Sequence, residues 1–222
     1  MNQIILSFIF LLLLNNSFAQ NAFNMKGERE GVWMGYHING AVKYSGQFTN
    51  GREYGIFKYY DLAGHLAISL NYLDTGLTSK AIVYYPNGAI KSQGYYYNKA
   101  KSDLWISYNA AGQKIQQENY KQGVLEGEVI YYYNNGAIAE SYHYTNGEKN
   151  GIGKKFYQSG FLNMQCNYQD NLPHGLAQFY YNKSGELIES RGVFYLGRKD
   201  SIWEFYDDQG ILIKKANFSY ED

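Results

Sequence analysis

The chain alternates short apolar runs with turn residues over most of its length. In residues 127–150, an aromatic run is followed by Asn-Asn-Gly, then by a run that alternates apolar and polar residues, then by a second Asn-Gly. Two such runs joined by a tight glycine turn are typical of a β-hairpin, and the second turn connects this hairpin to the next one.

The same unit recurs every 24 residues, and eight copies can be aligned. They begin at Gly31, Gly55, Ser79, Asp103, Gly127, Gly151, Gly175 and Ser201, the last after two extra residues. Positions are numbered from the first residue of each copy. The turn glycine occupies position ten in Gly40, Gly64, Gly88, Gly112, Gly136, Gly160 and Gly210, and is displaced by one residue in Gly185.

Connections this short join antiparallel neighbours, so each strand pairs with the strand before it. The period therefore predicts an all-β fold: an elongated, single-layer antiparallel meander of about eight 24-residue β-hairpin repeats, with about sixteen strands.

Position six is aromatic in every copy, and we interpret these rings as the structural aromatics of the repeat. They are Tyr36, Tyr60, Tyr84, Tyr108, Tyr132, Phe156, Tyr180 and Tyr206. In the second strand of copy six, Leu162, Met164, Cys166 and Tyr168 alternate with polar residues, which indicates one packed face and one wet face.

Further aromatics occur at positions three, five and seven of the first strand. Strand alternation places positions three and five on the face opposite position six, and we assign all three positions to that face as candidate ligand-facing aromatics. They are Trp33, Tyr59, Trp105, Tyr131, Tyr133, Tyr157 and Trp203. They could bind sugar rings or a partner protein, or they could pack across adjacent hairpins and stiffen the sheet. We favour the packing role.

The chain divides into three parts. Residues 1–19 have the pattern of a secretory signal peptide, with an apolar stretch at Ile4–Leu14 that is too short to span a bilayer and a cleavage site near Ala19-Gln20. We therefore expect an exported protein, in the periplasm, on the outer surface or outside the cell. Residues 20–30 are expected to form an N-terminal partial repeat, and residues 31–222 the eight full repeats.

Charge and composition limit the partners. Lys+Arg and Asp+Glu balance at 20 each, so there is no basic field for nucleic acid, and the balance also argues against anionic membrane lipid. The single cysteine, Cys166, excludes an internal disulfide, and its inward-pointing position predicts a small buried hydrophobe.

Catalytic patterns are missing from the sequence. The four histidines occupy unrelated repeat positions without metal-ligand spacing, and a Cys166/His174 pair lacks an orienting partner. The stretch Gly151–Lys155 lacks the upstream glycine of a phosphate loop. We expect no enzyme, no cofactor and no metal.

Units such as YYPNGAIKSQGYYYN at residues 84–98 and YYYNNGAIAESYHYTNGEKNG at residues 131–151 resemble the MORN repeat. The resemblance is to the bacterial variant found in proteins labelled YwqK-like antitoxins, and it covers essentially all of residues 27–222. It implies an elongated single-layer sheet of hairpins that serves as a binding or scaffolding element. Eukaryotic relatives are linked to membranes and phosphoinositides.

These observations favour an exported, non-enzymatic repeat scaffold that binds another protein at the cell envelope or surface. The alternative is a glycan-binding module that uses exposed aromatic rows. A further alternative is an antitoxin-like neutralising binder.

Overall fold

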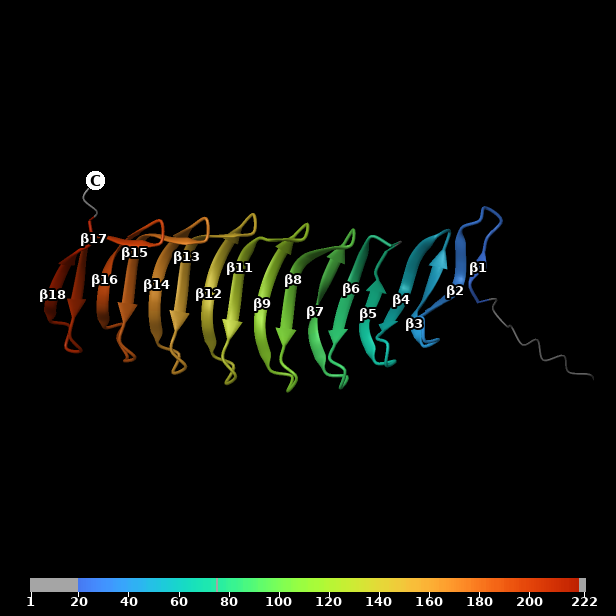
Figure 1. The fold of residues 1–222 in the computed structure, drawn as a ribbon, viewed down its shortest axis with the longest axis horizontal. Helices are drawn as coiled ribbons and strands as arrows, with labels where there is room; N and C mark the ends of the chain where they lie inside the picture. Colours follow the sequence, from blue (N-terminus) through green and yellow to red (C-terminus); the bar gives the residue numbers. More distant parts are fainter. Residues whose placement is uncertain (1–19, 75, 220–222) are drawn as a thin grey trace, which may run out of the picture.

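The computed structural model describes residues 20–74 and 76–219, and the proposed signal peptide lies outside them. Within these residues the protein is all-β, and its strands form one long antiparallel sheet that does not close into a barrel (Figure 1). The predicted hairpin meander is therefore confirmed. No helix in the described part of the chain is long and apolar enough to cross a membrane.

The strands follow one another along the sheet in sequence order. The N-terminal half contains β1 (Ala22–Phe23), β2 (Arg29–Tyr36), β3 (Val42–Thr49), β4 (Arg52–Tyr60), β5 (Leu66–Tyr72), β6 (Thr78–Tyr84), β7 (Ile90–Tyr97), β8 (Ala100–Tyr108) and β9 (Lys114–Lys121). The C-terminal half contains β10 (Val124–Leu125), β11 (Gly127–Tyr132), β12 (Ile138–Thr145), β13 (Glu148–Phe156), β14 (Leu162–Gln169), β15 (Leu172–Tyr180), β16 (Ile188–Tyr195), β17 (Arg198–Tyr206) and β18 (Leu212–Asn217).

Two short strands account for the difference from the sixteen expected. Strand β1 pairs with the start of β2, and β10 pairs with β9 just before β11 does so. At the same end of the sheet, the Asn21 side chain accepts a hydrogen bond from the Met34 backbone N–H at 2.8 Å and donates one to its carbonyl at 3.0 Å. Asn21 thus covers part of the β2 edge that β1 leaves unpaired.

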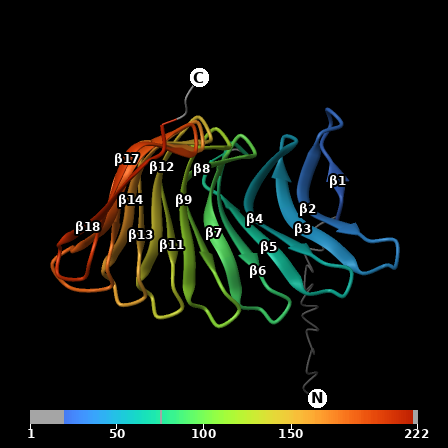
Figure 2. The same cartoon turned by 60° about the vertical axis from the view of Figure 1, so that its left-hand side comes forward.

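Bulges bend the strands so that the sheet curves in cross-section (Figure 2). Most connections between hairpins show a register shift, for example between Tyr142 and Tyr144 where β12 pairs with β13. The first residue of most copies has a positive φ in this region, as at Gly151 with 98°, which suits glycine. Where β5 pairs with β6, no register shift occurs.

The core lies on one face and is built from positions three and sixteen of successive strands. Cross-strand pairs place these residues in one row along the sheet, and large side chains in it adjoin small ones. A Cβ added at Gly46, Gly94 or Gly192 would overlap the ring of Phe57, Trp105 or Trp203 respectively. Glycine at these positions therefore makes room for the aromatic of the next copy.

Candidate functional site

The three tryptophans proposed as ligand-facing are buried. Trp33, Trp105 and Trp203 have 9%, 2% and 0% of their surface exposed. The Trp105 indole N–H donates to the Tyr95 carbonyl at 2.9 Å. The tryptophans therefore do not form the exposed ligand-binding row that was the alternative to packing, because position three pairs with position sixteen inside the core row.

Two of the candidate tyrosines connect neighbouring copies. The hydroxyl of Tyr133 donates to the Phe156 carbonyl at 2.7 Å, and that of Tyr157 donates to the Tyr180 carbonyl at 2.8 Å. Both side chains are half-buried. In these two copies position seven thus joins one hairpin to the next, which is a packing role.

The remaining two candidates, Tyr59 and Tyr131, are half-buried on the core face. The Tyr131 side chain packs against the cluster formed by Val129, Tyr142 and Tyr144. Tyr59 lines a hollow described below.

The structural aromatics at position six lie on the outer face, opposite the core. Tyr36 is 54% exposed and Tyr180 is buried, whereas Tyr60, Tyr84, Tyr108, Tyr132, Phe156 and Tyr206 are half-buried. The Tyr132 hydroxyl contacts Gln117 at 3.3 Å, and the Lys114 ammonium lies over the Tyr132 ring. The structural aromatics at position six therefore pack against polar neighbours outside the core, whereas the candidate ligand-facing positions three and five lie on the core face.

An exposed aliphatic row runs along this outer face at position two. We call it the outer row; it comprises Val32, Ile56, Leu104, Ile152, Leu176 and Ile202, which are 37–57% exposed. Successive copies are two strands apart, which places these side chains about 10 Å from one another. Lys80 and Glu128 occupy the same position in the other two copies and are also exposed. The row was not predicted from the sequence, although its 24-residue recurrence is visible there.

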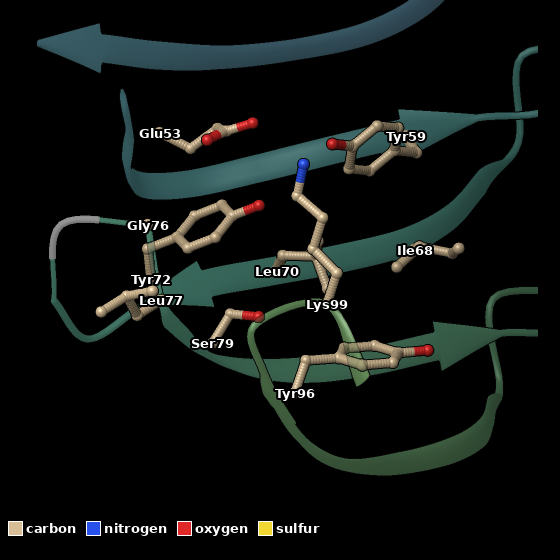
Figure 3. Close-up of a pocket in the computed structure, with 10 residues that line it drawn as sticks. All are labelled: Glu53, Tyr59, Ile68, Leu70, Tyr72, Gly76, Leu77, Ser79, Tyr96 and Lys99. Carbon is tan, nitrogen blue, oxygen red and sulfur yellow. The ribbon is translucent and has the colours of Figure 1, made fainter. Parts of the chain in front are cut away.

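A hollow of about 370 Å³ opens on the core face, over β4 to β7 (Figure 3). Aromatic side chains contribute to its lining, and we call it the repeat-3 hollow. Its lining consists of Glu53, Tyr59, Ile68, Leu70, Tyr72, Gly76, Leu77, Ser79, Tyr96 and Lys99. Apart from Tyr59, these residues were not singled out by the sequence analysis.

The hollow arises because three adjacent strands carry no ring in the core row. Between Phe57 on β4 and Trp105 on β8, the row contains Leu70, Ala81 and Gly94. The two aromatic strands are four strand spacings apart, or about 19 Å. Neither flanking ring can fill the space between them.

Burial and charge keep the hydroxyls of the hollow protonated. Burial, with further contributions from Tyr59 and Glu53, raises the pKa of Tyr72 to about 12. Burial also raises the pKa of Tyr59, with Glu53 as the next cause. At neutral pH both phenols therefore remain hydrogen-bond donors as well as acceptors.

Among the described residues, no group of three or more His, Cys, Asp or Glu side chains is arranged to hold a metal ion. Cys166 is buried, as expected, and burial raises the pKa of its thiol to about 11. The thiolate that a nucleophile requires is thus disfavoured.

The protein-family model described as MORN repeat variant matches the chain at residues 77–98 and 125–146. The chain is a MORN repeat protein. Such repeats are in general protein-interaction or scaffold modules and are generally not catalytic. The two matched stretches cover the hairpins of copies three and five. The 24-residue period extends the same pattern to the other copies of this MORN repeat protein.

No curated protein matches the chain. Among solved structures, there is a similarity to a mutant of S. aureus TarM in complex with Fondaparinux, alpha-GlcNAc-glycerol and UDP. The sequences are 14% identical, the match covers 43% of this chain and 19% of that one, and the TM-score is 0.33. A similarity this weak carries no argument about function.

Proposed function

We propose that this MORN repeat protein is an exported, non-enzymatic scaffold that binds a partner protein at the cell envelope or surface. Export is supported by the signal-peptide pattern of residues 1–19. The observation that carries the protein-binding role is the outer row, because aligned exposed aliphatic side chains are typical of interaction surfaces.

The C-terminal part of the outer row offers the most apolar surface. Ile152, Leu176 and Ile202 belong to three consecutive copies, and each is more than half exposed. Val193, on the strand beside Leu176, is also exposed and pairs directly with it. A partner that lays apolar side chains along copies six to eight would remove this surface from water, which is favourable by about 25 cal/mol per Å² of apolar area.

The test is capture of a partner by residues 20–222 immobilised on a support, with envelope extract as the source. Replacing Ile152, Leu176 and Ile202 together by serine should abolish capture, because it removes the apolar contact without altering the core face. The control replaces three polar outer-face residues, Gln47, Asn71 and His143, by serine and should retain capture. Equal capture by both triple variants would contradict the proposal.

The glycan-binding alternative loses the exposed tryptophans on which it depended, since all three are buried. The antitoxin-like alternative is a special case of protein binding, supported by the resemblance to YwqK-like proteins, and identification of the captured partner as a toxin would favour it. Balanced charge continues to argue against a nucleic acid or anionic lipid partner.

A further inference from the structure

The repeat-3 hollow has features that the protein-binding proposal does not use. It lies on the core face, whereas the outer row lies on the opposite face, so the two surfaces are separate. We propose that the repeat-3 hollow binds one or two rings of a neutral saccharide. This function is additional to the scaffold role and does not depend on it.

The polar side chains of the hollow converge on one region. Figure 3 shows the Glu53 carboxylate, the Lys99 ammonium and the hydroxyls of Tyr59 and Tyr72 pointing toward one another from β4, β5 and the β7–β8 turn. Neither Glu53 nor Lys99 forms a side-chain hydrogen bond or ion pair with any described residue. Both charges are therefore available to a ligand placed between them.

This set of groups matches sugar hydroxyls. A carboxylate only accepts hydrogen bonds, an ammonium only donates them, and each phenol can do both. A sugar hydroxyl can likewise donate to Glu53 and accept from Lys99 or a tyrosine. The opposite charges of Glu53 and Lys99 cancel, which favours a ligand without net charge.

The rest of the hollow supplies the apolar surface that a sugar ring needs. Tyr96 lies on one side and Tyr59 on the other, with Leu70 between them (Figure 3). An aromatic face can cover the C–H groups of a pyranose while the ring hydroxyls reach the polar groups. The volume of about 370 Å³ lies in the lower range of small-molecule sites.

The experiment titrates residues 20–222 with cellobiose, maltose and N,N′-diacetylchitobiose, and follows saturation-transfer NMR signals and the tryptophan fluorescence, to which Trp105 contributes from its place beside Tyr96. At least one disaccharide should saturate the protein. Glu53→Gln should then weaken binding by about tenfold, which corresponds to about 1.4 kcal/mol for one charged hydrogen bond. Tyr96→Ala should abolish binding by removing the stacking face.

Matched controls separate the site from general effects. Tyr59→Phe removes one hydroxyl of the hollow and should weaken binding, whereas Tyr131→Phe makes the same change at position five of copy five and should not. Circular dichroism melting confirms that each variant is folded.

Three results would overturn the proposal. The first is that no disaccharide saturates the protein at about 10 mM, which corresponds to a binding free energy weaker than about 3 kcal/mol. The others are that Glu53→Gln binds like the wild type, or that phenylalanine, a zwitterion, competes for the site. Partner capture through the outer row is measured in a separate experiment. Its success or failure therefore does not affect the test of saccharide binding.

Discussion

Copies three and six both lack an aromatic residue at position three, yet of these two only copy three leaves a hollow on the core face. In copy six, Gly153 lies between Tyr142 and Cys166 on the adjoining strands. The Tyr142 ring makes an edge contact with Tyr168 at 5.4 Å, and the Lys149 ammonium lies 3.6 Å from the Tyr142 ring centroid.

In copy three, Ala81 lies between Leu70 and Gly94, neither of which has a ring. Filling of the core face is therefore decided by the sum of side-chain volumes on neighbouring strands, and a single copy does not determine it. A repeat protein can thus open a site at one place without changing its period or its turns.

The largest expected effect on stability is in copy six, where the core face is filled. Tyr142→Ala removes a buried ring that covers Gly153 and should lower the free energy of unfolding by about 3 kcal/mol. Tyr72→Ala, next to the hollow, should cost less, because the Tyr72 ring already borders open space. Urea unfolding followed by circular dichroism measures both, and an equal loss would contradict the difference between the regions.

A smaller effect is expected from adding volume at position sixteen. Cys166 is 1% exposed, so Cys166→Phe overfills the core and should cost about 1–3 kcal/mol. Leu70→Phe adds a ring at the same repeat position where space exists, so its cost should stay below about 1 kcal/mol while saccharide binding is lost. A Leu70→Phe variant as unstable as Cys166→Phe would show that the hollow is not free space.

The smallest effect concerns alkaline pH. Burial, as the first cause in each case, raises the pKa of Tyr72 to about 12 and that of Tyr144 to about 12, above the ordinary value near 10. Between pH 10 and 12 these phenols ionise in the unfolded chain before the folded one. Their stabilising contribution is therefore complete below pH 10 and is lost as the pH rises through 12.

Unfolding midpoints in urea at pH 9 and pH 11 measure this loss. Tyr72→Phe and Tyr144→Phe should each reduce the dependence on pH. Occupation of the hollow by saccharide should alter the Tyr72 contribution and leave that of Tyr144 unchanged. An unaltered pH dependence in both variants would argue against burial of these hydroxyls.

The period and the turns could be predicted from the sequence because each depends on local chemistry. Glycine at position ten adopts a positive φ, as at Gly40 with 82° and Gly136 with 84°, and the short turns force neighbouring strands to pair. The 24-residue spacing then yields the hairpin meander and the order of its strands.

The packed face of the second strand could be predicted from its alternation, as at Met164 and Cys166, but the first-strand position that packs with it could not, because position three has no constant residue type. The residue at position three varies in size from Gly153 to Trp203 and nevertheless lies in the core. Its side-chain volume is balanced by the volume of the residue at position sixteen of a neighbouring strand. This balance becomes visible only when the cross-strand register, with its bulges, is known. The hollow depends on three strands at once, and for the same reason no single copy reveals it.

The tyrosine hydroxyls that join the copies all point the same way along the chain. Tyr85, Tyr133, Tyr157 and Tyr181 each donate to a carbonyl of the following copy. Removal of copy one or copy two thus breaks none of these four links, whereas removing the final hairpin returns the Tyr181 hydroxyl to water. The links therefore run in one direction along the chain. Evolutionary loss or gain of copies should be tolerated more readily at the N-terminal end of the array than at its C-terminal end.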